Sequence, residues 1–198
     1  MSTTTFIPSY SSSEEQRPYR GSVAMMSLII GESAIFTIFV VAYIFYLGKS
    51  ITGPTPRQVL EIPLFNTICL LSSSLTIWIA ERRIERNRIS AFGGWLAITI
   101  ALGLIFLTGT ALEWHKLIYR DGLTISTNLF GTTFYSLVGL HATHVVLGLL
   151  MLSVVLVSTM AGKVRAPQAQ RFGVLALYWH FVDAVWVVVF TVVYIVGR

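Results

Sequence analysis

One acidic residue, Glu32, lies well inside an apolar stretch that begins near residue 22. Its carboxyl is about ten helical residues, or roughly 15 Å, from the start of that stretch, which is close to the middle of a bilayer. Acids at such depth are costly, face protein or water, and often mark ion or proton pathways. Two interpretations stay open for Glu32: a proton-linked or lipid-contacting role, and a structural hydrogen bond between helices.

Two histidines, His141 and His144, stand three positions apart in a later apolar stretch. This spacing places both imidazole rings on one helix face. Intramembrane histidine can ligate haem or a metal, but a bis-histidine haem needs histidines on facing helices, and only His180 remains within another stretch. We therefore expect no metal ligand and no catalytic residue in this chain.

His180 and Asp183 repeat the same spacing inside the segment LYWHFVDAVWVVVF. A carboxylate at this distance can fix the tautomer of the imidazole, so the pair can satisfy itself. Structural pairing across helices and a proton-linked role fit this pair equally well. The other acids near apolar stretches fall at their ends, where charged groups reach the headgroups and are expected to be solvated; they are Glu61, Glu81, Glu85 and Glu113.

The composition indicates that lipid is the solvent of these residues. Hydrophobic residues make up 55% of the 198 residues and charged residues only 12%, whereas about a quarter of residues are charged in soluble proteins. The mean hydropathy is +0.73. The net charge of +5 is spread over the segments between apolar stretches, which favours membrane topology over nucleic-acid binding. Phosphate-binding glycine loops and sets of histidine boxes are absent from the sequence.

Five stretches are long enough to cross a membrane, so the sequence predicts an all-α integral membrane bundle of five transmembrane helices. A polar cytoplasmic tail (1–21), without signal-peptide features, precedes a membrane domain (22–198). The expected spans are 22–46, 62–82, 89–112, 134–160 and 172–197. The fourth stretch is long enough for two helices, but its first part, 122–133, is rich in Thr, Ser, Asn and Gly, so we expect one span there.

The distribution of Lys and Arg predicts a cytoplasmic N-terminus and an external C-terminus. With that orientation nine cations lie on the cytoplasmic side, namely Arg17, Arg20, Arg82, Arg83, Arg86, Arg88, Lys163, Arg165 and Arg171. Five lie outside, namely Lys49, Arg57, Lys116, Arg120 and Arg198. Small residues are expected where helices approach closely; the candidates are Ser72, Ser73, Ser74, Gly93, Gly94, Gly103, Gly109 and Gly139.

Four motifs together are similar to a known family. LIIGES in the first span, PLFNTICLLSSSLTIWIA after a GPTP loop, GLHATHVVLG in the fourth span and YWHFVDAVW in the last occur in one order and spacing. They resemble subunit III of the haem-copper terminal oxidases. The chain resembles the short bacterial form, which lacks the first two of the seven helices found in longer members and with them half of a lipid-filled cleft.

The resemblance implies a non-catalytic accessory subunit of an aerobic oxidase in the bacterial plasma membrane, without haem or copper of its own. It would pack on subunit I, which holds the redox centres, with subunit II, a small subunit IV and membrane lipids as further partners, and a bound phospholipid is compatible with it. It would support proton uptake and slow inactivation. By motif, Glu32 matches the family's carbodiimide-reactive carboxylate; the other matching polar positions are His141, His144, His180, Asp183 and Glu113.

Two other functions compete with this one. A related subunit accompanies some nitric oxide reductases, and the sequence separates these complexes poorly. An independent proton-coupled transporter would use similar buried acids, but it predicts an internal repeat, and none is visible between the halves of the chain. The electron donor of the complex, cytochrome c or quinol, is left open by the sequence.

Overall fold

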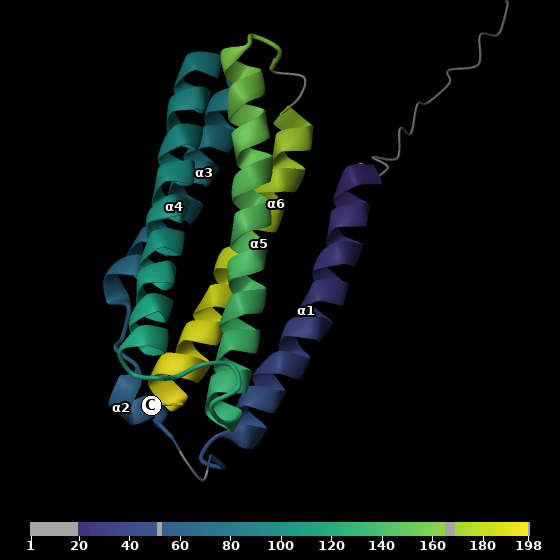
Figure 1. Ribbon diagram of the computed structural model, residues 1–198. Helices are drawn as coiled ribbons and strands as arrows, with labels where there is room; N and C mark the ends of the chain where they lie inside the picture. The colour runs from purple at the N-terminus through teal and green to yellow at the C-terminus, as the bar shows by residue number, and fades with distance from the viewer. Residues whose placement is uncertain (1–19, 51–52, 165–168, 198) are drawn as a thin grey trace, which may run out of the picture.

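The computed structural model describes residues 20–50, 53–164 and 169–197, and within them it is all-helical (Figure 1). The elements are α1 (Arg20–Tyr46), the short α2 (Pro56–Val59), α3 (Leu64–Glu85), α4 (Ile89–Tyr119), α5 (Leu129–Met160), α6 (Ala169–Phe190) and the π-helical η2 (Thr191–Val196). Five helices are long and apolar enough to cross a membrane. The expected all-α class and number of spans are thus confirmed. Most of the expected tail, and Arg17, Arg165 and Arg198, lie outside the described residues.

Four helices form a closed bundle, and α1 lies beside it. α3 packs against α4, α4 against α5, α5 against α6, and α6 against α3, which completes the ring. α1 packs mainly on α5 and α6, at the edge of the bundle (Figure 1). Its outer face carries exposed apolar side chains such as Ile30, Ile38 and Phe45, so α1 is the helix with the largest share of its surface left for lipid or a partner.

Two helices extend by five or more residues beyond the spans expected from hydropathy. α4 continues to Tyr119, past the expected end at 112, and α5 begins at Leu129, ahead of the expected start at 134. Asn128 caps α5, because its side-chain oxygen accepts a hydrogen bond of 2.8 Å from the Gly131 amide. The Thr133 hydroxyl donates to the Leu129 carbonyl at 2.9 Å. Polar residues of this segment therefore bond within the helix, which is why hydropathy placed its start too late.

The centre of the bundle is filled by the indole of Trp179, which is fully buried. A Cβ atom added to Gly148 of α5 would lie 2.8 Å from this ring, and one added to Gly103 of α4 would lie 3.1 Å from it. The indole Nε1 donates to Ser73 Oγ of α3 at 2.9 Å. A single side chain of α6 thus contacts the other three helices of the ring.

The expectation that small residues mark helix contacts is only partly correct. An added Cβ would meet a neighbouring helix at Gly103, Gly109 and Gly139, so these positions are confirmed. Gly94 has nothing within 4 Å of an added Cβ, and Ser72 is exposed, so these two positions are wrong. The sequence pattern did not single out Gly148.

The last helix widens into the π-helical turn η2 before it ends. Such a turn contains one residue more than the α-helix needs, and it rotates the side chains that follow. Tyr194, within η2, is 1% exposed. The turn therefore directs the Tyr194 ring into the bundle, where it meets a carboxylate of α4.

Candidate functional site

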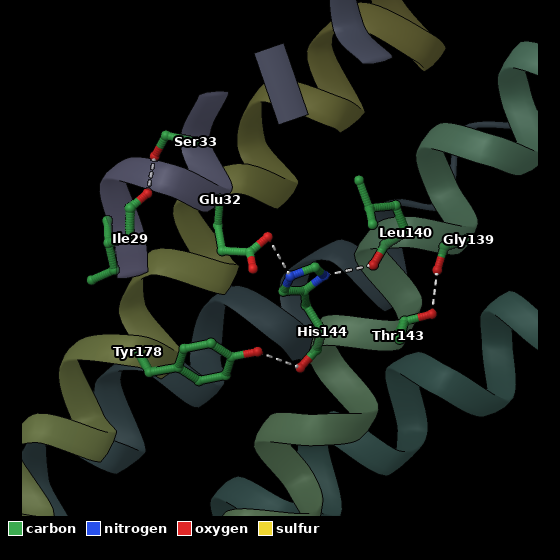
Figure 2. Close-up of polar contacts among 8 residues, drawn as sticks. All are labelled: Ile29, Glu32, Ser33, Gly139, Leu140, Thr143, His144 and Tyr178. Atoms are coloured by element: carbon green, nitrogen blue, oxygen red, sulfur yellow. Dashed lines mark hydrogen bonds and ion pairs between the residues drawn. The ribbon is translucent and has the colours of Figure 1, made fainter. Parts of the chain in front are cut away.

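The carboxylate of Glu32 on α1 meets the imidazole of His144 on α5 (Figure 2). Glu32 Oε2 lies 3.1 Å from His144 Nε2. The Glu32 side chain is 24% exposed and that of His144 is 10% exposed. The two residues predicted from separate motifs are therefore one site, which joins the edge helix to the ring.

The second ring nitrogen of His144 determines where the protons of this pair lie. His144 Nδ1 is 2.8 Å from the Leu140 carbonyl oxygen, and a carbonyl only accepts, so Nδ1 carries a hydrogen. The contact between Nε2 and Oε2 then needs one more proton, either on the carboxyl or on the ring. In both forms the pair has no net charge, which makes it compatible with a low-dielectric surrounding.

Aromatic and hydroxyl groups enclose the His144 side of the pair. The Phe36 ring lies 5.0 Å from the His144 ring between centroids. The Tyr178 hydroxyl donates to the His144 carbonyl at 3.3 Å, and Figure 2 shows it approaching from α6. The hydroxyl of Ser33 donates to the Ile29 carbonyl of its own helix, so it does not compete for the Glu32 carboxylate.

An apolar groove lies next to this site between α1 and α6. Its volume is about 320 Å³. Phe36 and Val40 of α1 and Phe181 and Val185 of α6 line it. Phe36 thus lines the groove and also contacts the His144 ring. The groove and the Glu32–His144 pair therefore lie on either side of the Phe36 ring.

His141 lies on the same helix as His144 but has a different environment. It is completely buried, with its ring 4.9 Å from that of Trp186 and 5.8 Å from that of Phe106 between centroids. In the part of the chain that the structure describes, neither of its ring nitrogens has a hydrogen-bond partner. Both histidines of α5 are buried, but of the two only His144 contacts a carboxylate.

His180 and Asp183 of α6 are linked through a third residue, Ser74 of α3. Ser74 Oγ lies 3.0 Å from His180 Nδ1, and the Ser74 hydroxyl donates a hydrogen bond to Asp183 Oδ2. The direct contact that the sequence spacing suggested is replaced by this bridge. Asp183 is 3% exposed, and no hydrogen-bond partner is found for its Oδ1 among the described residues.

Glu113 is bound by Tyr194 rather than left to solvent. The Tyr194 hydroxyl lies 2.9 Å and 3.0 Å from the two carboxylate oxygens. Glu113 is half-buried within α4, because α4 continues beyond the expected span. The expectation of a solvated span-end acid holds better for Glu61, whose side chain is 81% exposed and pairs with Lys116.

Two contributors to these clusters were missed from the sequence, Ser74 and Tyr194. Ser74 was considered only as a small packing residue, and Tyr194 has no motif of its own. Across residues 20–50, 53–164 and 169–197, no group of three or more His, Cys, Asp or Glu side chains is placed to hold a metal ion.

Comparison with known proteins gives consistent matches over most of the chain. Residues 22–198 match the family described as cytochrome c oxidase subunit III. The chain is 38% identical to cytochrome c oxidase subunit 3 of Alkalihalophilus pseudofirmus, over 84% of this chain and 82% of the relative. It is 38% identical to cytochrome c oxidase subunit 3 of a Synechocystis species, over 96% of this chain and 82% of the relative. It is 32% identical to cytochrome bo(3) ubiquinol oxidase subunit 3 of Pseudomonas aeruginosa, over 85% of this chain and 81% of the relative.

Proposed function

The chain belongs to the cytochrome c oxidase subunit III family, and on this premise we propose that it is the accessory subunit of an aerobic haem-copper oxidase in a bacterial plasma membrane. The family match over residues 22–198 carries this proposal, because it includes every long helix of the bundle. The chain contributes to oxygen reduction through contact with its neighbours. Haem and copper belong to those neighbours, chiefly subunit I, with subunit II and a small subunit IV as further partners.

The Glu32–His144 contact is the part of the chain that we propose to be proton-linked. It holds one proton between two helices without net charge, and its carboxylate is the more exposed of the two groups. A group of this kind accepts a proton from one side and releases it toward the other, provided that the helices stay in place. This supports a role in sustained proton uptake by subunit I. We assign His141 and Glu113 to packing of the bundle.

The apolar groove beside this pair is the proposed site of a phospholipid acyl chain. Seven of its nine lining residues are aliphatic or aromatic, the exceptions being Ser33 and Thr37. It opens between α1 and α6, where the outer face of α1 is also apolar. An acyl chain in the groove would contact Phe36 and so hold the His144 ring in place.

The end of the bundle that carries the α3–α4 turn is the proposed cytoplasmic end. Among the described residues this end holds Arg82, Arg83, Arg86, Arg88, Lys163 and Arg171. The opposite end holds Lys49, Arg57, Lys116 and Arg120. The excess of basic residues agrees with the usual rule for cytoplasmic loops.

Purification from a bacterial membrane in mild detergent tests the assignment. We expect a tag on this chain to recover larger haem-containing subunits, identified by mass spectrometry, and we expect the chain expressed alone to be colourless. Removal of the chain from the complex should leave initial oxygen consumption intact but shorten the time before activity is lost. Recovery of the chain without any oxidase subunit, or a haem spectrum from the chain alone, would contradict the assignment.

A further inference from the structure

Ser74 is the central member of a chain of hydrogen bonds that runs from a half-buried side chain to an enclosed one. His180 is half-buried on α6, whereas Asp183, one turn further along the same helix, is 3% exposed. The Ser74 hydroxyl of α3 contacts His180 Nδ1 at 3.0 Å and is hydrogen-bonded to Asp183 Oδ2. Both contacts use the same oxygen atom, so Ser74 connects the two ionisable groups.

A serine hydroxyl has one hydrogen, so with a neutral imidazole there are two arrangements in which Ser74 donates to one partner and accepts from the other. In the first, Ser74 donates to an Asp183 carboxylate and accepts from Nδ1–H of a neutral His180, whose Nε2 has a free lone pair. In the second, a protonated Asp183 donates to Ser74, Ser74 donates to Nδ1, and the hydrogen of the neutral His180 is on Nε2. The two arrangements differ by one proton.

We propose that His180, Ser74 and Asp183 form a proton-binding relay, with its entry at His180 Nε2 and its storage position at Asp183. A proton that binds Nε2 converts His180 to an imidazolium. The Nδ1–H bond then breaks as that proton passes to Ser74 Oγ, and the Ser74 O–H bond breaks as its own proton passes to Asp183 Oδ2. The result is a carboxylic acid, an unchanged serine and a neutral imidazole, with one proton gained; release reverses these steps.

The surroundings of Asp183 favour the proton-loaded state. Asp183 Oδ1 is enclosed without a hydrogen-bond partner among the residues described, so an ionised Asp183 places one unpaired carboxylate oxygen in a low-dielectric surrounding. In the relay that we propose, the proton-loaded form is therefore the resting form.

Several other ionisable side chains lie on the helices packed against α6, and none of those named next has a hydrogen bond to His180, Ser74 or Asp183 in the described part of the chain. Glu32 of α1 is bound to His144 of α5, and Tyr194 of η2 is bound to Glu113. The His141 ring of α5 lies 4.9 Å from the Trp186 ring between centroids, and Cys69 of α3 is buried. Near the end of α3, the Glu81 carboxylate lies beside Gly173. The relay is therefore distinct from the Glu32–His144 pair, and it does not depend on the function proposed above.

Infrared difference spectroscopy of the full chain, with whatever subunits accompany it in mild detergent, tests the relay. The carboxylic acid band of Asp183 is identified by its loss in Asp183→Asn. We expect this band to be present at neutral pH. On transfer to D₂O the acid proton exchanges for deuterium and the band shifts, and we expect this exchange to be roughly tenfold or more slower in Ser74→Ala than in the wild type. The matched control, Ser72→Ala, removes an exposed hydroxyl from the same helix and should exchange at the original rate. Ser74→Thr, which keeps a hydroxyl, should also exchange at or near that rate.

A second variant keeps the test decisive if Ser74→Ala does not assemble. His180→Gln retains a group that can bond to Ser74 but cannot carry the entering proton, so it should slow the exchange to a similar extent. The relay would be overturned if the Asp183 band were missing at every pH. It would also be overturned if the exchange rate were equal in the wild type and in the variant that assembles, Ser74→Ala or His180→Gln. Neither outcome would bear on whether oxidase subunits accompany the chain.

Discussion

Glu32 Oε2 and His144 Nε2 are 3.1 Å apart, although 112 positions separate the two residues in the sequence. The contact lies between α1, which packs on the edge of the bundle, and α5, which belongs to the closed ring. Among the described residues, it is the one side-chain hydrogen bond found between these two helices. A change in the protonation of the Glu32–His144 pair therefore changes the contact that holds α1 against α5.

Substitution of Glu32 should separate the charge of this contact from its hydrogen bond. In Glu32→Gln the amide can still bond to His144 Nε2, so we expect normal assembly and thermal stability, but faster loss of oxidase activity during turnover. In Glu32→Leu the imidazole loses its partner, which should lower the free energy of unfolding by about 1–3 kcal/mol. Thermal unfolding in detergent and oxygen consumption measure the two effects.

Ser27→Ala is the matched control for these variants. Ser27 is exposed on the same helix, outside the groove, and its hydroxyl donates to the Val23 carbonyl of that helix, so stability and turnover should change little. Identical inactivation rates in Glu32→Gln and the wild type would exclude a protonic role for Glu32 while leaving lipid contact open.

A methyl group added at Gly148 should disturb the centre of the bundle. In Gly148→Ala the new Cβ lies 2.8 Å from the Trp179 ring, which cannot move because three helices enclose it. Overpacking of this kind costs about 1–3 kcal/mol, visible as a lower unfolding temperature. The control is Gly31→Ala on α1, where nothing lies within 4 Å of the new atom; it should be neutral or stabilising.

The number of helices could be predicted from the sequence because each apolar stretch meets the membrane requirement by itself. Which side chains meet could not be predicted in this way, because it depends on how the helices are rotated against one another. The three consecutive serines illustrate this. Successive helical residues point about 100° apart, so Ser72 is exposed, Ser73 meets Trp179 and Ser74 meets His180.

The candidate residues of the site were identified more successfully than their partners. Glu32 and His144 were recognised from their depth and motifs, but only the packing of α1 on α5 brings them together. The π-helical turn has no signature in hydropathy, because Thr191–Val196 reads as an ordinary continuation of the last span. For this reason Tyr194 was not recognised as the partner of Glu113.

Removal of the Ser73 hydroxyl should leave the Trp179 indole without an acceptor. Both groups are completely buried and bonded at 2.9 Å, so Ser73→Ala should cost about 1–3 kcal/mol of unfolding free energy. Ser72→Ala, at an exposed position on the same helix, should be neutral. Equal melting temperatures for both variants would show that this hydrogen bond contributes nothing to stability.

Loss of the Tyr194 hydroxyl should leave the Glu113 carboxylate without its donor. Tyr194→Phe keeps the ring that fills the end of the bundle, so any change reports on the two hydrogen bonds alone. We expect destabilisation of about 1–3 kcal/mol. Tyr119→Phe, at a position that is 77% exposed, is the control and should melt with the wild type.

The place of Trp179 in the chain also bears on how the protein is made. α6 leaves the ribosome after α1, α3, α4 and α5, yet its indole fills the space that Gly103 and Gly148 leave between α4 and α5. Before α6 is in place, no side chain fills this space. The packing of the ring is therefore complete only when the fifth long helix has joined the other four.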